Sequence, residues 1–463
     1  MGCRPRHRGR RCPAAVPARV VHSCDHIERI PVSLSQTAPP ADPTADARPA
    51  AATSPSSVTS LLQDISTIGR DTSRGGYSRP VFSTAETDLR NWFIEQAGRR
   101  GLDVATDHNG IIWAWWDTSA GTRRDAVVTG SHLDSVPGGG EYDGPLGVAS
   151  ALVAVDILKA RGLRPRRPLA IAVFPEEEGS RFGVACLGSR LLTGELDPDK
   201  ARRLKDPDGN TFADVAAANG QDPRLIGADY KTLQQLGVFV ELHVEQGRGL
   251  VDLNQPVAVG SSILGHGRWK LSISGQGNHA GTTLMADRKD PMIAAAKIMV
   301  NIRDTARKYR DARATVGRVQ PVPGGTNVIA SRVDLWIDVR HPDDSVTAAL
   351  VEAIGLNAQV FAAEEGCGAS LTMESLSPTV HFDGGLRDRL KELLPGAPVL
   401  DTGAGHDAGV LASHIPTAML FVRNPTGISH SPDELVEDWD AEAGAVALAD
   451  ALAGLMGEAR AIG

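Results

Sequence analysis

The chain has 463 residues, which is long for one domain, so length alone predicts two. Hydrophobic residues make up 41% and charged residues 22%, which leaves enough apolar material for a packed core. The net charge of −8 argues against nucleic acid as the main partner, because such proteins need a basic face. No apolar run approaches the roughly 20 residues that span a bilayer, so we expect no membrane partner.

The first 57 residues differ in composition from the rest. A stretch rich in Arg and His is followed by one rich in Ala, Pro, Ser and Thr, which is typical of disorder. We interpret 1–57 as a disordered N-terminal extension or the product of a wrongly assigned start codon; a metal-binding tail is a weaker alternative. Five sparse cysteines, three of them in this stretch (Cys3, Cys12 and Cys24), do not resemble a disulfide scaffold and indicate the reducing cytosol.

From Val58 onward, helical and strand-like segments alternate. Helical spacing predicts helices within 57–69 and 83–101, the second with Ser83 or Thr84 as its N-cap. An apolar helix is expected at 147–162. Short apolar, β-branched runs predict strands at 111–117, 125–134, 168–178 and 238–247. This alternation is typical of an α/β fold with a mixed, largely parallel sheet.

The pattern changes between about residues 265 and 375. Segments 268–275 and 332–340 alternate apolar and polar residues, and helical runs at 291–309 and 345–366 interleave with them. This order predicts a small α+β unit with one sheet face open. Short apolar strands and a final Ala-rich helix follow. We therefore expect one discontinuous domain, formed by 58–264 and 376–463, with a second domain inserted at 265–375.

Five separated segments place a metal-type ligand at or near the end of an apolar run. They are GSHLDSV, GGGEYDGPLG, FPEEEGSRFG, ELHVEQG and GISHSPDE, which contain His132, Asp143, Glu178, His243 and His430. Functional sites in open α/β sheets gather at the carboxyl ends of the strands. Three imidazoles and two carboxylates, one of them bridging, can hold two divalent ions, and this donor set suits Zn and also Mn, Co or Ni.

Each of these residues has an ordinary interpretation when it is taken alone. A His at a strand end is usually a satisfied polar residue, and Asp143 beside glycines is typical of a turn. The run Glu176–Glu178 would normally be a solvated surface, but here it follows a buried-looking strand, where unpaired carboxylates are costly. The prediction therefore depends on the joint pattern.

From residue 58 to the C-terminus the sequence resembles the dinuclear metal amidohydrolases of the M20 peptidase superfamily, hydantoinase/carbamoylase branch. The resemblance is carried by GSHLDSVPGGGEYDGPLGV, EEEGSRFG, ELHVEQG, GQGNHAGTTLMADRKDP, GGTNVI, DVRHPDD, GAGHDA and GISHSPDE, in that order. It implies a metallopeptidase-like catalytic domain with an inserted dimerisation, or lid, domain. His266 in LGHGRW departs from the family's pattern and is a candidate for altered substrate contacts.

The resemblance also implies roles for individual residues. The five ligands would be His132, Asp143 as the bridge, Glu178, His243 and His430; Asp134 would orient His132, and Glu177 would be the general base. His279 would stabilise the oxyanion from the partner subunit of a homodimer. The predicted substrate contacts are Gln246, Asn327, Arg340 and His406. A bidentate Arg340 would suit a carboxylate.

These residues predict a cytosolic, homodimeric enzyme that cleaves the carbamoyl C–N bond of N-carbamoyl-L-amino acids, with a small ureido acid as its ligand. Three alternatives stay open at the level of sequence. Allantoate amidohydrolase has the same metal set, a dinuclear zinc aminopeptidase or dipeptidase belongs to the wider superfamily, and a catalytically dead relative would keep only the dimer fold. No predicted ligand is substituted, which argues against the last.

Overall fold

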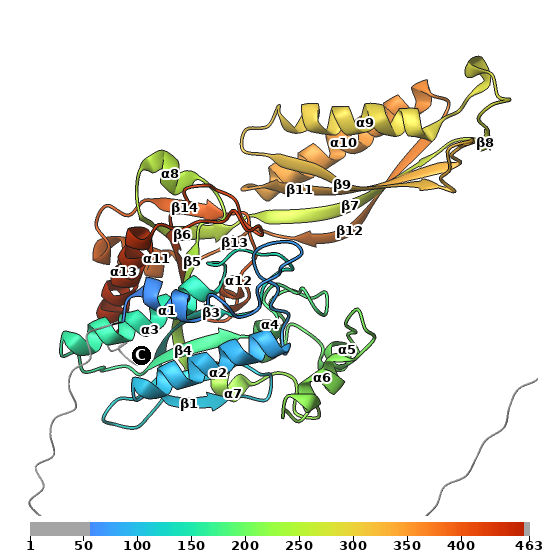
Figure 1. Ribbon diagram of the computed structural model, residues 1–463. Helices are drawn as coiled ribbons and strands as arrows, with labels where there is room; N and C mark the ends of the chain where they lie inside the picture. Colours follow the sequence, from blue (N-terminus) through green and yellow to red (C-terminus); the bar gives the residue numbers. More distant parts are fainter. Residues whose placement is uncertain (1–55, 458–463) are drawn as a thin grey trace, which may run out of the picture. The chain divides into compact units, whose positions relative to one another are not determined.

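The computed structural model describes residues 56–457 (Figure 1). The predicted extension, with Cys3, Cys12 and Cys24, therefore lies outside the described residues, apart from its last two serines. Ser57 caps the first helix, α1 (Val58–Asp64), by accepting the N–H of Ser60. Ser83 does the same for α2 (Thr84–Arg99) through the N–H of Glu86, so the first of the two predicted cap candidates is the N-cap.

The larger sheet has nine strands in the order β1-β2-β4-β3-β5-β15-β6-β13, with β14 paired to β6. Its central strands β4, β3, β5 and β15 run parallel, whereas β1, β2, β6 and β13 pair antiparallel. This confirms the mixed, largely parallel sheet. The strands span Asp103–Thr106 (β1), Ile112–Trp116 (β2), Ala126–His132 (β3), Leu169–Phe174 (β4), Leu236–Val244 (β5), Val257–Ile263 (β6), Val380–His381 (β13), Val399–Thr402 (β14) and Thr417–Val422 (β15).

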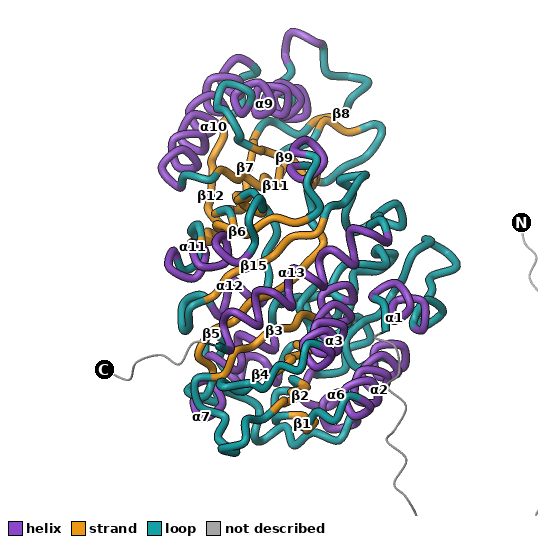
Figure 2. The backbone as a smooth tube through the Cα atoms, turned by 90° about the vertical axis from the view of Figure 1, so that its left-hand side faces the viewer, coloured by secondary structure: helices purple, strands orange, loops and turns teal. Residues whose placement is uncertain are grey.

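Helices cover both faces of this sheet (Figure 2). Strands β3, β4, β5 and β15 are buried at every residue. Alternate side chains along each strand enter one of two hydrophobic clusters, as the two-residue period of a strand requires. One cluster includes α1, α2, α3 (Pro145–Ala160) and α13 (Asp438–Met456); the other includes α4 (Leu187–Thr193) and α12 (Asp407–Leu411). The shorter helices are α5 (Pro198–Arg202), α6 (Phe212–Ala218), α7 (Tyr230–Leu233), α8 (Gly249–Leu253) and α11 (Gly384–Leu393).

A separate four-stranded antiparallel sheet has the order β12-β7-β11-β9 and its own hydrophobic cluster. Its strands are β7 (Gly265–Ser274), β9 (Arg313–Val322), β11 (Arg332–His341) and β12 (Gly368–Ser377). Helices α9 (Pro291–Ala306) and α10 (Asp344–Glu364) lie on one face, as Figure 1 shows. The exposed positions of β9 and β12 indicate that the other face is open, as the sequence predicts.

The sequence analysis missed β9 and β12, the two outer strands of this sheet. The short strands β8 (Asn278–His279) and β10 (Val328–Ile329) follow β7 and β9 in the chain and pair with each other, and the 3₁₀ turn Met285–Asp287 lies between β8 and α9. The predicted boundary at 264/265 coincides with the start of β7, whereas the predicted boundary at 375/376 falls inside β12. The assignment of these segments to an inserted lid domain stays a prediction.

Within residues 56–457, one helix, α10, is long and apolar enough to cross a membrane by length and composition alone. One side of it, which includes Leu350, Ile354 and Ala358, is buried in the cluster of the four-stranded sheet. Core helices of globular proteins meet the same criterion, so this feature by itself carries little weight.

Candidate metal centre

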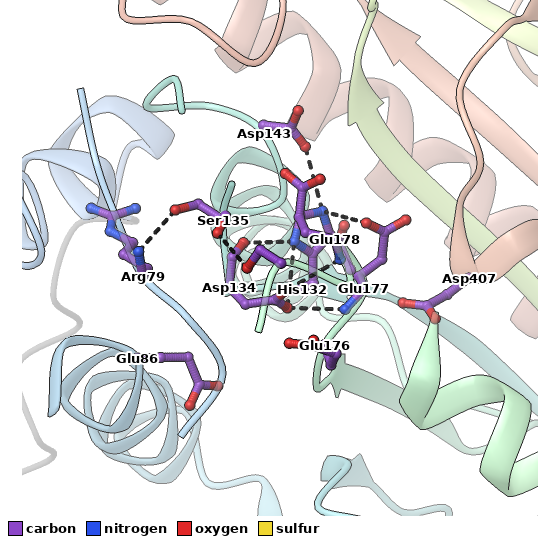
Figure 3. Close-up of polar contacts among 12 residues, drawn as sticks. Arg79, Glu86, His132, Asp134, Ser135, Asp143, Glu176, Glu177, Glu178 and Asp407 are labelled. Atoms are coloured by element: carbon purple, nitrogen blue, oxygen red, sulfur yellow. Dashed lines mark hydrogen bonds and ion pairs between the residues drawn. The ribbon is translucent and has the colours of Figure 1, made fainter. Parts of the chain in front are cut away.

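Three neighbouring strands bring the predicted site residues together. His132 is the last residue of β3, Glu177 follows β4 by three residues, and His243 lies one residue before the end of β5. Because β4, β3 and β5 are parallel neighbours, their carboxyl ends meet at one edge of the sheet. Figure 3 shows Asp143, Glu177 and Glu178 gathered around His132.

Asp143 lies at the centre of the cluster, between two groups of potential ligands. Its Oδ1 is 3.5 Å from Nε2 of His132 and 3.2 Å from Nε2 of His243. Its Oδ2 is 3.6 Å from Nε2 of His430, which is also 3.4 Å from Oε2 of Glu178. Asp143 therefore belongs to both triads that could hold an ion, one with His132 and His243 and one with Glu178 and His430.

Backbone contacts fix how the two buried imidazoles point. Nδ1 of His132 is 2.9 Å from the carbonyl oxygen of Asp134, and Nδ1 of His243 is 3.0 Å from that of Val244. A carbonyl only accepts, so each Nδ1 carries the proton and each Nε2 presents a lone pair to the cluster. Both Nε2 atoms, and Oε1 of Glu178, are buried without a hydrogen-bond partner. Unpaired buried atoms are costly, and bound cations would satisfy them.

The run Glu176–Glu178 is buried, and its three carboxylates point in different directions. Glu176 has a left-handed backbone (φ 54°), and its carboxylate accepts the N–H groups of Arg181 and Phe182. Oε2 of Glu177 lies 3.7 Å from Nε2 of His132, whereas Glu178 faces His430. The neighbouring glutamates can therefore serve separate purposes.

Asp134 holds this turn in place. Its two carboxylate oxygens accept the backbone N–H groups of Glu177 and Glu178, each at 3.2 Å. The nearest carboxylate oxygen is 3.9 Å from Nδ1 of His132, so it is the Asp134 carbonyl that contacts the imidazole. The predicted orienting residue thus lies beside His132, but its carboxylate positions the glutamate backbone.

Burial and neighbouring charges shift the ionisation of the cluster strongly. Burial raises the pKa of Glu177 well above its usual value, and that of Glu178 to about 8. Burial would also raise the pKa of Asp143, but the adjacent imidazoles of His132 and His243 hold it well below the ordinary range. Clusters of carboxylates and imidazoles with strongly shifted pKa values are typical of functional sites. Bound cations would stabilise the ionised forms of these carboxylates.

Gly144 allows the loop to pass close to His132. Its φ is +86°, and a Cβ there would lie 2.6 Å from both Cε1 and Nδ1 of the imidazole. Pro145 then begins α3 at a position that does not need its missing N–H. The motif DGPLG therefore places Asp143 and starts the helix behind it.

Glu434 is a site residue that the sequence analysis missed, although its motif GISHSPDE was noted. Its Oε1 accepts the backbone N–H groups of Tyr142 and Asp143, each at 3.0 Å, across about 290 residues of sequence. The carboxylate thus joins the loop of His430 to the loop of Asp143. Gly140 makes room for it, because a Cβ there would lie 2.3 Å from Oε1.

Two more buried carboxylates behind the cluster were also missed. Glu241 accepts the Ser131 hydroxyl and the Ala408 N–H, and Asp407 accepts the Ser189 hydroxyl. Burial raises the pKa of both groups. Glu241 forms a further possible ligand triad with His243 and His406.

His406 and Gln246, two of the predicted substrate contacts, lie beside the cluster. The ring of His406 is 4.4 Å from that of His243, and its Nδ1 is 3.9 Å from Oε1 of Glu177. Burial, followed by the charge of His243, holds the pKa of His406 well below its usual value. The amide of Gln246 donates to Oδ2 of Asp143 at 2.7 Å.

The other predicted residues lie around the four-stranded sheet. His279 and Asn327 are exposed neighbours, linked by the β8–β10 pairing and by the Ala280 N–H, which donates to the Asn327 carbonyl. Arg340 on β11 donates to both oxygens of Asp338 and to the Gly403 carbonyl. Across residues 56–457, none of the three forms an ion pair or a side-chain hydrogen bond with the predicted ligands.

Known proteins agree with this combination of fold and site. The model of the peptidase family M20/M25/M40 matches residues 128–454. N-carbamoyl-L-amino acid amidohydrolase of Geobacillus stearothermophilus is 34% identical over 84% of this chain and 95% of its own length. Allantoate amidohydrolase of Escherichia coli K12 is 32% identical over 83% of this chain and 94% of its own length. A crystal structure of a hydantoinase/carbamoylase family amidase from Burkholderia multivorans superimposes with a TM-score of 0.77, at 30% identity, over 87% of this chain and 97% of that one.

The chain therefore belongs to the M20/M25/M40 peptidase family, and its similarity is to the amidohydrolases of the hydantoinase/carbamoylase branch. Amidohydrolases of this family depend on metal ions, and the two triads that share Asp143 are a donor set that such ions accept.

Proposed function

We propose that the protein is a metal-dependent amidohydrolase that cleaves the carbamoyl C–N bond of N-carbamoyl-L-amino acids. One water is consumed, and the products are the free amino acid, ammonia and carbon dioxide. The observation that carries the proposal is the single carboxylate of Asp143 shared by two triads, with a separate, buried Glu177 beside them. Similarity to an N-carbamoyl-L-amino acid amidohydrolase over most of both chains supports the substrate class.

We propose His132, Asp143 and His243 for one divalent ion and Asp143, Glu178 and His430 for a second, with Zn or Mn, Co or Ni as the metals. Ions bound there would polarise the substrate carbonyl and lower the pKa of a bound water. The buried Nε2 atoms of His132 and His243, each aimed by a backbone carbonyl, support this assignment.

Glu177 is proposed as the general base. Its carboxylate takes a proton from the attacking water and returns it to the leaving nitrogen. Burial raises its pKa well above the usual value, so it holds that proton readily between the two steps. Asp134 keeps the base in place through the N–H of Glu177.

Arg340 and Asn327 are proposed to bind the carboxylate of the substrate, and His279 to stabilise the negative oxygen that develops during attack. A guanidinium has five N–H donors, and Arg340 makes three side-chain hydrogen bonds within residues 56–457. His406 and Gln246 are proposed to contact the ureido group, because both lie against the cluster.

We further propose that the enzyme is a cytosolic homodimer in which His279 serves the partner's site. Exposed apolar side chains on α9 and α10 support an interface: Val300 is 53% exposed, and Leu356 and Val360 are each 58% exposed. Replacing Val300 and Leu356 with Asp should give a monomer by light scattering. A wild-type chain that is itself monomeric at micromolar concentration would contradict the dimer.

Ammonia release by the Mn- or Zn-loaded protein tests the main proposal. The substrates would be several N-carbamoyl-L-amino acids, N-carbamoyl-β-alanine, allantoate and a few dipeptides. We expect turnover of the carbamoyl amino acids. Turnover of allantoate instead would favour the second candidate, which similarity to the Escherichia coli enzyme supports. Hydrolysis of dipeptides alone would replace both with a peptidase, and a metal-loaded protein inactive on every compound would overturn the proposal.

A further inference from the structure

A cavity of about 180 Å³ lies next to the candidate metal centre. Gln246, which donates to Asp143, forms part of its wall. Other lining residues come from the segment before α8, from the start of β9 and from β14; they include Arg248, Arg313, Asp401 and Gly403. A substrate held at the metal centre can therefore extend past Gln246 into this cavity.

Two exposed arginines, Arg248 and Arg313, line the cavity. Within residues 56–457, neither guanidinium forms an ion pair or a hydrogen bond, whereas Arg340 and Arg423 each pair with an aspartate. The stem of Arg248 packs against Gly427, where a Cβ would lie 2.3 Å from its Cγ. Arg248 is thus held against the loop that carries His430.

The strand register places Arg313 beside Arg340, the residue proposed to bind the substrate carboxylate. Arg313 is paired directly with Arg340 across β9 and β11, and Arg340 is paired with His266 on β7. Directly paired residues point to the same face of a sheet, so this row presents two guanidinium groups and an imidazole side by side. Asp338 pairs with Arg340, but no carboxylate among residues 56–457 forms an ion pair with Arg313. Like charges opposed across strands destabilise a sheet unless an anion lies between them.

The carboxylates that line the cavity leave these donors available. Glu245 turns its two oxygens to the N–H groups of Gly249 and Leu250, at 2.6 and 2.9 Å. Asp401 forms no ion pair with either arginine, although it lines the same space. The cavity therefore has charged N–H donors whose acceptor is not supplied by the described chain.

We infer that this cavity binds a second carboxylate of the substrate, so that the preferred substrates are N-carbamoyl derivatives of dicarboxylic L-amino acids. The inference rests on the proposed function and narrows its substrate class. Arg340 would bind the α-carboxylate, and Arg248 and Arg313 would bind the side-chain carboxylate. Two guanidinium groups suit such an anion, because charge-assisted hydrogen bonds are among the stronger ones.

The experiment compares N-carbamoyl-L-glutamate with N-carbamoyl-L-glutamine, which has the same size but no side-chain charge. The metal-loaded full chain is assayed for amino acid release, together with Arg248→Ala, Arg313→Ala and the double variant. Arg318→Ala is the matched control, because Arg318 lies on the same strand, stacks on Trp336 and does not line the cavity.

We expect the wild type to favour the glutamate derivative by about tenfold or more in kcat/KM. Each single variant should lose most of that preference, the double variant all of it, and the glutamine derivative should stay within about threefold throughout. The unchanged glutamine rate shows that the variants are folded. Arg318→Ala should behave as wild type.

The inference fails if the wild type does not favour the diacid, or if the variants slow both substrates equally; in either case the proposed function stands. If the metal-loaded wild type hydrolyses neither these compounds nor any other ureido acid, the proposed function fails and this inference fails with it.

Discussion

The two sheets of the protein differ in how much of each strand they bury, and the proposed chemistry follows this difference. In the nine-stranded sheet β3, β4, β5 and β15 are buried at every residue, and His132 and His243 belong to these strands. In the four-stranded sheet β9 and β12 are largely exposed, and His279 and Asn327 lie on exposed segments beside it. The fully packed sheet fixes the groups that must be placed most accurately, whereas the exposed sheet offers the residues proposed to meet the substrate.

This comparison predicts two kinds of defect. Changes beside the buried cluster should lower kcat or metal affinity, because they alter the reacting groups or their supports. Changes at Arg340 and Asn327, beside or on the four-stranded sheet, should raise KM for the carboxylate-bearing substrate and leave metal content alone. A change at His279 should lower kcat, again with metal content unchanged. Loss of metal from any of these three variants would break the comparison.

Glu177→Gln should have the largest effect. The amide cannot take a proton from water, so we expect kcat to fall by about 10²–10⁴-fold with metal still bound. The steady-state rate of ammonia release measures the fall in kcat. The metal content of the same sample shows whether metal is still bound. Undiminished turnover by the metal-loaded variant would remove Glu177 as the base.

Arg340→Ala should have the next largest effect, and it should appear in KM. Loss of a charge-assisted hydrogen bond to the substrate carboxylate raises KM by about 10–100-fold. Arg268→Ala is the matched control, because its Nε lies 3.7 Å from the same Asp338 on the neighbouring strand. Equal effects of the two substitutions would indicate that Asp338, and not the substrate, is the important partner.

Glu434→Ala should weaken metal binding by about tenfold, because groups that support metal ligands typically contribute 10–100-fold to affinity. The substitution leaves the N–H groups of Tyr142 and Asp143 without their acceptor. Glu434→Gln keeps a carbonyl oxygen at that position and should be milder. The dissociation constant for Mn²⁺ measures the metal affinity of both variants. If both bound Mn²⁺ as tightly as the wild type, the loop of Asp143 would need no support from Glu434.

Cys186→Ala should have the smallest effect, about a few-fold in kcat. The buried thiol lies 3.7 Å from Oε1 of Glu177, and its backbone N–H donates to the Glu177 carbonyl. A thiol is a weak donor, so its loss should loosen the base only slightly. Cys186→Ser restores a hydroxyl donor and should recover the rate. A serine variant as slow as the alanine variant would point to packing and not to the hydrogen bond.

The sequence predicted most of the buried sheet, because β2, β3, β4, β5 and β15 are apolar runs with clear ends. It missed β9 and β12, whose residues are mostly exposed and carry no apolar run. The five proposed ligands could be found from short motifs, of which those with His132, Glu178 and His243 lie at strand ends and those with Asp143 and His430 lie in loops. Glu434 and Glu241 could not, because their partners, Asp143 and Ala408, lie about 290 and 167 residues away in the chain. Sequence position gives no sign that such a carboxylate is buried.

Titration of metal-free protein with Mn²⁺, followed by ammonia release from an N-carbamoyl-L-amino acid, tests the central claim most directly. The account predicts no release without metal and a rate that rises until two ions per chain are bound, one for each of the two proposed triads that share Asp143. Full activity in the presence of a strong chelator, with no metal detectable in the protein, would contradict it.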